Sequence, residues 1–188
     1  MGIIPEGAAV RSSACVRWAA AGVALAVLAA DQLSKSLVLA AHPTGTDHLG
    51  TGGIGWVSVR LVRNTGASGG IASGYPVLVT LAAVAITGVA TGFALHVRSR
   101  AAALCLAAVI GGALGNLADR IFRAPGFGRG GVVDWIHFGG SGGSMDVADL
   151  AIQFGVLGAI IAIVVGDRVR KARRVPEASG AGSAPESH

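Results

Sequence analysis

The stretch AAALCLAAVIGGALGNLADR, which runs from Ala101 to Arg120, decides the fold class of this chain. It is apolar or small as far as Gly115, and a helix of this length comes close to spanning the hydrocarbon core of a membrane, which is about 30 Å thick. Asn116, Asp119 and Arg120 follow at i, i+3 and i+4 spacing, which places them on one helical face. The glycines at 111, 112 and 115 allow a second helix to approach closely. We therefore predict a transmembrane helix whose polar end lies beside a glycine-rich packing face.

Three further apolar runs of similar length bring the number of predicted membrane spans to four. The four runs cover about residues 18–41, 75–95, 101–117 and 147–165. Charged residues make up only 13% of the 188 residues and the mean hydropathy is +0.64, whereas soluble domains carry about 25% charged residues. This composition argues against a soluble enzyme, rules out a disordered chain and predicts an all-α membrane protein. The first run exceeds the apolar region of a signal peptide, so we predict that it is retained as a span.

Basic residues predict the orientation of these spans. They precede the first run, fill the link between the second and third runs, and follow the fourth at 168–174. Lys and Arg are enriched in the cytoplasmic flanks of membrane proteins, so both termini are predicted to be cytoplasmic and residues 42–74 and 118–148 to lie outside. The net charge of +5 and the isoelectric point near 10.2 therefore indicate orientation, and we predict no nucleic-acid partner.

The two predicted outer segments contain candidate strands. Residues 54–62 partly alternate between apolar and polar side chains, and residues 132–138 form a second short run of this kind. We predict a small extracytoplasmic β-sheet that lies on the membrane. The predicted organisation is a cytoplasmic segment at 1–16, a four-span domain at 17–167, and a basic and then disordered cytoplasmic tail at 168–188.

Ionisable side chains within spans are costly unless they are paired or hydrated, so each is a candidate functional residue. Asp31 and Lys35 are four residues apart on one helical face. A simpler interpretation is an ion pair near the outer surface, with Lys35 extending toward water. For the third span, the simpler interpretation is an interfacial cap in which Asp119 and Arg120 neutralise each other, but it leaves Asn116 unexplained.

The outer segments and the start of the fourth span add three aspartates and an asparagine to the candidate site. Asp134 lies in an apolar stretch, and Asp146 and Asp149 begin the fourth span. Either Asp146 or Asp149 alone would serve as the helix N-cap, and Asn64 in its Asn-Thr-Gly sequence would serve as a turn residue. The five histidines show no ligand spacing, so we predict no metal site.

Carboxylates that meet at the outer surface would provide acid–base chemistry. Two close carboxyl groups cannot both ionise at neutral pH, so one retains its proton and acts as an acid while the other activates a water. Peptide hydrolysis requires such a pair. The residue types do not decide which two of five aspartates form it: Asp31, Asp119, Asp134, Asp146 and Asp149.

Five motifs, taken in order, resemble the bacterial lipoprotein signal peptidase family, also called signal peptidase II. They are Asp31-Gln-Leu-Ser-Lys35, Asn64-Thr-Gly-Ala67, Gly111-Gly-Ala-Leu-Gly-Asn-Leu-Ala-Asp-Arg120, Val132-Val-Asp-Trp135 and Val147-Ala-Asp149. The third motif is the most specific, and the others gain weight from their order on four spans. The resemblance covers about residues 17–167 and implies four transmembrane helices with a small extracytoplasmic sheet.

This resemblance implies an aspartic endopeptidase of the bacterial plasma membrane. Such an enzyme cuts diacylglyceryl-modified prolipoproteins before the lipid-modified cysteine, uses no metal or cofactor, contacts membrane lipids and is inhibited by globomycin. By motif, the catalytic pair corresponds to Asp134 and Asp149. The supporting or substrate-binding positions correspond to Asp31, Lys35, Asn64, Asn116, Asp119, Arg120 and Asp146.

The chain departs from the family pattern at two motifs. Asp146 stands where the family usually has Asn, and a third carboxylate would raise the pKa of its neighbours unless it turns away or a base such as Arg120 offsets it. Ser68 is followed by Gly69 and Gly70, where the family usually has an aromatic residue. The glycine-rich stretch at 139–143 also lengthens the loop between the two proposed catalytic aspartates.

Two other functions remain as alternatives to the peptidase. A small four-span transporter would use membrane carboxylates as ion sites, but it should place them near the bilayer midplane, whereas these acids cluster toward one end of the spans. A catalytically inactive binding protein with the same fold is the other alternative, since Asp146 and the missing aromatic depart from the family pattern.

Overall fold

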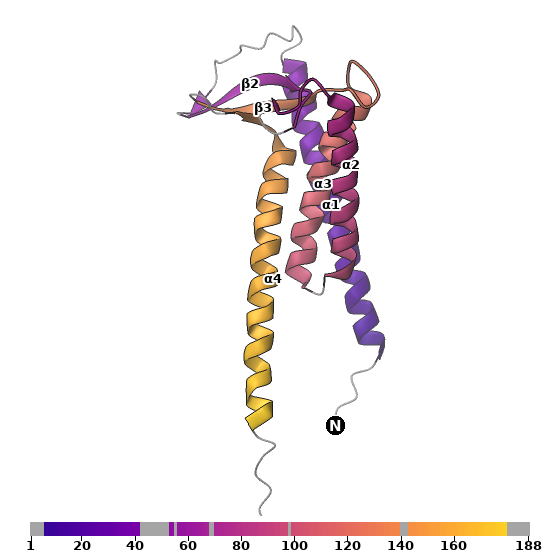
Figure 1. Ribbon diagram of the computed structural model, residues 1–188, viewed down its shortest axis with the longest axis vertical. Helices are drawn as coiled ribbons and strands as arrows, with labels where there is room; N and C mark the ends of the chain where they lie inside the picture. Colours follow the sequence, from indigo (N-terminus) through magenta and orange to yellow (C-terminus); the bar gives the residue numbers. More distant parts are fainter. Residues whose placement is uncertain are drawn as a thin grey trace, which may run out of the picture.

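The computed structural model describes residues 6–41, 53–54, 56–67, 70–97, 99–139 and 143–179 of the chain. Four helices dominate these residues and run roughly along one axis (Figure 1). Each contains a segment long and apolar enough to cross a membrane, which confirms the four predicted spans. The helices are α1 (Glu6–Ala41), α2 (Pro76–His96), α3 (Arg100–Phe122) and α4 (Val147–Ser179).

Helix α3 lies at the centre of the bundle, and α1, α2 and α4 all pack against it. Glycines make the approach of α1 and α4 possible. A Cβ atom at Gly111 would lie 2.5 Å from the Ala24 carbonyl oxygen of α1, and one at Gly112 would lie 2.6 Å from the Ala148 carbonyl oxygen of α4. The glycine-rich face predicted on the third span therefore serves two neighbouring helices.

Helix α4 contributes its own glycines to the contact with α3. A Cβ atom at Gly158 would lie 2.8 Å from Cys105 Sγ, and one at Gly155 would lie 2.7 Å from Val109 Cγ2. Cys105 is a free cysteine, and its side chain packs against α4.

A small antiparallel sheet crosses the end of the bundle at which α1 finishes and α4 begins (Figure 1). Its strands, in spatial order, are β1 (Gly53–Ile54), β2 (Val57–Asn64), β3 (Val132–Phe138) and β4 (Ser144–Met145). The register pairs Val62 with Asp134 and Asn64 with Val132, and an irregularity lies between Val59 and Val62. The predicted sheet is therefore confirmed, and β3 has the residue range predicted for it.

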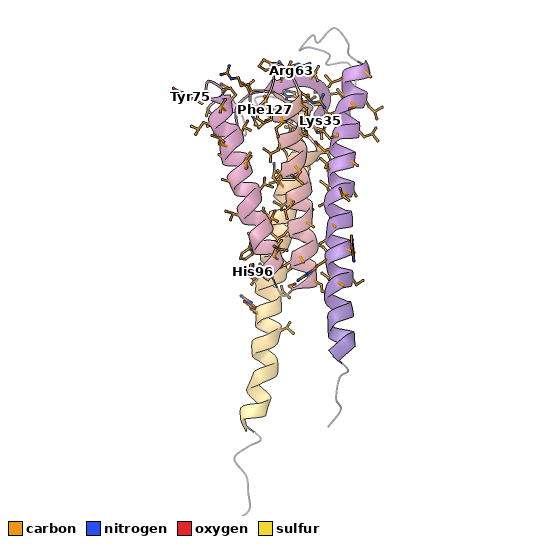
Figure 2. All side chains as sticks on the ribbon, turned by 90° about the vertical axis from the view of Figure 1, so that its right-hand side faces the viewer. Lys35, Arg63, Tyr75, His96 and Phe127 are labelled. Carbon is orange, nitrogen blue, oxygen red and sulfur yellow. The ribbon has the colours of Figure 1, made fainter. Side chains whose placement is uncertain are left out.

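The outer faces of the helices are apolar, as a lipid environment requires. Large apolar side chains such as Leu81 and Ile86 on α2 are 61% and 66% exposed. Aromatic side chains mark both ends of the bundle: Trp18 lies near the beginning of the first span, whereas Tyr75 and Phe127 lie at the same end as Lys35 (Figure 2). Aromatic residues are enriched at the two membrane–water interfaces, so these positions agree with a membrane-spanning bundle.

The tail differs in part from its prediction. Helix α4 continues past the apolar span, which ends at Val169, and reaches Ser179, so residues 176–179 are helical where disorder was predicted. Residues 180–188 lie outside the described part of the chain, as do Ser68, Gly69 and residues 140–142 of the predicted glycine-rich loop.

Candidate active site

Lys35 lies at the centre of a buried polar cluster at the sheet end of the bundle. Its ammonium nitrogen lies 2.8 Å from Asp31 Oδ2, 2.9 Å from Asp119 Oδ2 and 2.6 Å from Asp146 Oδ2. It also donates to Asn116 Oδ1 at 3.1 Å. The Lys35 side chain is fully buried, so the interpretation in which it extends to the surface is wrong, although its ion pair with Asp31 is present.

Asp31 and Asp119 connect this cluster to the elements that carry the other acids. Asp31 Oδ1 accepts a hydrogen bond from the Ala148 backbone N–H at the beginning of α4, at 3.0 Å. Asp119 Oδ2 accepts one from the Val133 backbone N–H in β3, at 3.1 Å. Both aspartates are fully buried. They therefore fix the start of α4 and the first residues of β3 relative to α1 and α3.

Arg120 does not pair with Asp119, contrary to the simpler interpretation of the third span. Its Nη2 donates to the Gly66 carbonyl oxygen at 2.6 Å and its Nη1 to the Thr65 carbonyl oxygen at 3.4 Å. Asp119 instead contacts Lys35 and Arg123, because adjacent helical residues point about 100° apart whereas residues four apart share a face. Arg120 therefore holds the loop after β2 against α3.

Asp146 is the N-cap of α4 and an ion-pair partner at the same time. Its Oδ1 accepts a hydrogen bond from the Asp149 backbone N–H at 2.7 Å, and its Oδ2 faces Lys35. The cap interpretation is therefore correct for Asp146 and does not apply to Asp149. Lys35, rather than Arg120, is the base that offsets the charge at this position.

Two asparagines donate hydrogen bonds to the two aspartates that correspond, by motif, to the catalytic pair of the family. Asn64 Nδ2 donates to Asp134 Oδ2 at 3.2 Å, and Asn116 Nδ2 donates to Asp149 Oδ1 at 3.1 Å. The side-chain oxygen of Asn64 also accepts from the Gly66 N–H at 2.9 Å, so the predicted turn is present as well. Asn116 connects Lys35 to Asp149, since each of its amide atoms contacts one of them.

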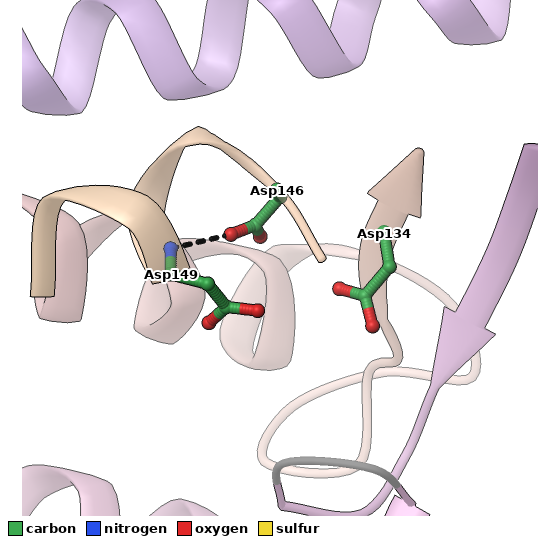
Figure 3. Close-up of side chains that lie close together, drawn as sticks. All are labelled: Asp134, Asp146 and Asp149. Carbon is green, nitrogen blue, oxygen red and sulfur yellow. Dashed lines mark hydrogen bonds between the residues drawn. The ribbon is translucent and has the colours of Figure 1, made fainter. Parts of the chain in front are cut away.

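Asp134 and Asp149 face each other across the gap between β3 and α4, with Asp146 beside them (Figure 3). One carboxylate oxygen from each of the three residues lies within 4.8 Å of the other two. Asp134 is only 2% exposed, and its Oδ1 has no hydrogen-bond partner. Burial, together with the negative charges of Asp146 and Asp149, raises the pKa of Asp134 to about 7. Burial also raises the pKa of Asp146 to about 7, against the attraction of Lys35.

The pair of aspartates lines a pocket of about 450 Å³. Its polar wall contains Asn64, Asn116, Arg120, Asp134 and Asp149. Its other walls are mostly apolar and come largely from α2, through side chains such as Leu78, Ala82 and Ile86, with Ile152 of α4 opposite. All nine predicted site residues belong either to the buried cluster around Lys35 or to this polar wall.

The three aspartates at 134, 146 and 149 have the oxygen donors that a hard cation prefers. However, an ammonium group contacts Asp146, and amide N–H groups of asparagines point at Asp134 and Asp149. Positive charge and donor hydrogens already surround the carboxylates, so the surroundings fit an aspartate pair better than a metal. The absence of a metal stays a prediction.

Two contributors to the cluster were not predicted from the sequence. Gln32 Nε2 donates to the Gly115 carbonyl oxygen at 3.0 Å and to Asp119 Oδ1 at 3.2 Å. Arg123 contacts Asp119 from one turn further along the chain. The i, i+4 spacing of Asp119 and Arg123 is a signal that would have found the second contact.

The fold and this site define a class of multi-pass membrane enzyme. Two solved structures, both described as bacterial membrane enzyme structures obtained by the in meso method, have the same fold. One, at 2.3 Å resolution, has a TM-score of 0.65 and 21% identity, over 90% of this chain and 94% of that one. The other, at 1.9 Å resolution, has a TM-score of 0.60 and 25% identity, over 77% of this chain and 91% of that one.

The family model for signal peptidase (SPase) II matches residues 23–165, and the chain belongs to that family of proteases. A lipoprotein signal peptidase of Rhodococcus jostii is 41% identical over 77% of this chain and 71% of its own length. Another, from Leifsonia xyli, is 34% identical over 86% of this chain and 74% of its own length. Family membership and the position of the acids at the ends of the helices both disfavour the transporter alternative.

Proposed function

We propose that this protein removes the signal peptides of diacylglyceryl-modified prolipoproteins by cutting before the lipid-modified cysteine. Asp134 and Asp149 are the proposed catalytic pair. The observation that carries this proposal is that a buried carboxyl group with an unpartnered oxygen faces a second carboxylate in the polar wall of a mostly apolar pocket. The names of the related proteins support the substrate class, because they are lipoprotein signal peptidases.

In the proposed reaction, Asp134 starts as the acid and Asp149 as the base. The raised pKa of Asp134 favours a retained proton on that residue, and Asp149, which accepts a hydrogen bond from the Asn116 amide N–H, is then the partner that acts as the base. Asp149 takes a proton from a water, whose oxygen attacks the peptide carbonyl carbon, while Asp134 gives its proton to the carbonyl oxygen. As the C–N bond breaks, Asp149 returns its proton to the amine, and Asp134 recovers the proton of the hydroxyl group.

The supporting residues would hold this pair in place and leave room for the lipid. Asn64 and Asn116 orient the two carboxyl groups. The buried cluster around Lys35 fixes the positions of β3 and α4, which carry them. Helices α2 and α4 both line the pocket, and each packs chiefly against α3. The acyl chains of the substrate, or globomycin in their place, would lie along the apolar wall that α2 provides.

We also propose that the sheet and the active site lie outside the plasma membrane, with both termini in the cytoplasm. The basic residues support this orientation because Arg17, Arg100 and Arg168 all lie at the ends of the spans opposite to the acid cluster. Residues 1–16 and 168–188 would then be the cytoplasmic segments on either side of the membrane domain.

The test uses the purified full chain and a diacylglyceryl-modified preprotein, with cleavage followed as a shift on a gel. Asp134→Asn and Asp149→Asn should each lower the cleavage rate by about a hundredfold or more, because each removes a group that transfers a proton. Added globomycin should stop cleavage by the unaltered chain.

Asp167→Asn is the matched control, because it makes the same change at an exposed position of α4 far from the cluster. It should cleave at the rate of the unaltered chain. Full activity of either Asp134→Asn or Asp149→Asn would reject the assigned pair. If the unaltered, folded chain cleaves no lipidated preprotein, the inactive binding protein becomes the better description.

A further inference from the structure

A second pocket lies at the end of the bundle opposite to the acid cluster, and the proposed peptidase reaction does not use it. It has a volume of about 640 Å³, within the range of about 300–1,000 Å³ typical of small-molecule sites. Residues of α1, the end of α2 and the beginning of α3 line it. Helices α1 and α2 each pack against α3, and the pocket lies between α1 and α2 in the half of the bundle opposite to the acid cluster.

Small apolar side chains form the walls of this pocket. Ala20 and Ala24 contribute from α1, Ala94 from α2, and Ala103 and Ala107 from α3. Because each of these side chains ends at Cβ, the three helices leave a groove that larger residues would fill. A groove of this kind within the hydrocarbon region suits an acyl chain.

The mouth of the groove carries positive charge. Arg17 of α1 and Arg100 at the start of α3 both line it, both are exposed, and Ser99 lies beside Arg100. None of the described residues that line the groove is acidic. Arginine binds phosphate oxygens through paired N–H donors, so these two side chains are suited to a phosphodiester.

The depth of these groups in the membrane matches that of a phospholipid. Trp18, which follows Arg17, is 79% exposed, and exposed tryptophans mark the headgroup level. Ala24 lies seven residues beyond Arg17, and Ala107 lies seven residues beyond Arg100. At a rise of 1.5 Å per residue, the groove runs about 10 Å from the arginines into the hydrocarbon on both helices.

We propose that this groove binds an anionic phospholipid of the membrane. The phosphate group lies between Arg17 and Arg100, and one acyl chain lies against the alanines of α1, α2 and α3. The site is separate from the catalytic pocket, so its occupation does not depend on the peptidase function.

Native mass spectrometry of the detergent-purified full chain tests this proposal, with dioleoyl phosphatidylglycerol and dioleoyl phosphatidylcholine as competing probes. The unaltered protein should retain phosphatidylglycerol in preference. Arg17→Gln and Arg100→Gln should each lower this preference about fivefold, as expected for one basic residue near a phosphate. The double variant should retain the two lipids equally.

The control is the double variant Arg63→Gln/Arg168→Gln, which removes the same charge outside the groove and should keep the preference. A variant that fills the groove, Ala20→Leu/Ala94→Leu, should lose both lipids while it still cleaves preprotein. Equal retention of the two lipids by the unaltered protein would overturn the proposal, as would an undiminished preference in the Arg17→Gln/Arg100→Gln variant. Loss of a dimer peak on filling the groove would instead identify a second copy of the chain as its occupant and reject the lipid.

Discussion

Lys35 allows three aspartates to lie within a single buried cluster. An unpaired charge inside a protein is expensive, and removal of one partner from a buried pair typically costs about 3–5 kcal/mol. Here the ammonium group contacts all three carboxylates, and each of them also accepts a backbone N–H, from Ala148, Val133 or Asp149. The cluster therefore joins α1, α3, β3 and the start of α4 at the place where the proposed catalytic pair meets.

Asp146 should control the pH dependence of cleavage through its charge. In the proposed mechanism Asp134 must keep its proton, so kcat/KM should fall as the pH rises through about 7. Burial raises the pKa of Asp134, and the negative charge of Asp146, when ionised, raises it further, so Asp146→Asn should lower that pKa and move the alkaline limb to lower pH. The measurement is kcat/KM for a lipidated peptide between pH 5 and pH 9, a range that extends about two pH units on either side of the pKa of Asp134.

Asparagine is a good N-cap, so the α4 cap should survive this substitution and the variant should remain folded. Asp167→Asn, which changes an exposed acid, should leave the profile unchanged. An alkaline limb that moves upward in Asp146→Asn, or stays in place, would contradict the assignment of the retained proton to Asp134.

Sequence reasoning identified the candidate site residues that the fold brings together, but not all of their partners. Asp134, Asp149 and the two asparagines meet as the motifs implied. The contacts of Lys35 with Asp119 and Asp146 were not predicted, because both residues are far from it along the chain and only the fold brings them together. Spacing on one helix predicted the pair with Asp31 and could not predict the other two.

At the scale of helices, close packing around α3 depends on where glycine is placed. Gly115 faces the Asp31 carboxylate so closely that a Cβ atom there would overlap Asp31 Oδ2. The same carboxylate holds Lys35 and the Ala148 N–H. Gly115 therefore provides the space in which the polar cluster forms. It also allows α1 and α3 to pack closely.

Gly115→Ala should therefore disturb both stability and cleavage. Overpacking typically costs about 1–3 kcal/mol, which corresponds to a Tm lower by about 3–10 °C for a chain of this size. Thermal unfolding in detergent measures this effect, and cleavage should fall with the displaced Asp31. Gly88→Ala on α2 is the matched control, since nothing lies within 4 Å of a Cβ atom there, and its Tm should not fall. Equal stability of the two variants would refute the role of Gly115.

The long elements could be predicted from the sequence, and the short strand β4 could not. Apolar length identified all four spans, and the short run at residues 132–138 was predicted as a strand. Strand β4 has only two residues, Ser144 and Met145, and it exists because β3 lies beside it. The helical end of α4 was missed because its composition alone favours disorder, whereas a helix already formed through the span continues into it.

The molecule as a whole has two chemically different ends. Acids and their partners gather beneath the sheet, whereas Arg17, Arg100 and Arg168 lie at the opposite ends of the spans. The proposed orientation rests on this asymmetry, because basic flanks are enriched on the cytoplasmic side of membrane proteins.

Labelling with a membrane-impermeant maleimide tests the orientation. Cys15 is an exposed free cysteine at the basic end, so it should react in inside-out vesicles and not in right-side-out vesicles. A Trp56→Cys/Cys15→Ser variant should show the reverse, because Trp56 is 83% exposed at the sheet end. Labelling of Cys15 in right-side-out vesicles would require the opposite orientation.

The ion pairs within single helices have a consequence for how the protein is made. Asp31 and Lys35 are one turn apart on α1, and Asp119 and Arg123 are one turn apart at the end of α3. Each aspartate thus carries a counter-ion on its own segment before any other segment arrives. During synthesis, each segment can enter the bilayer with these charges already neutralised, and the contacts between helices form afterwards. The residues that later surround the proposed catalytic pair would therefore also lower the cost of membrane insertion of the segments that carry them.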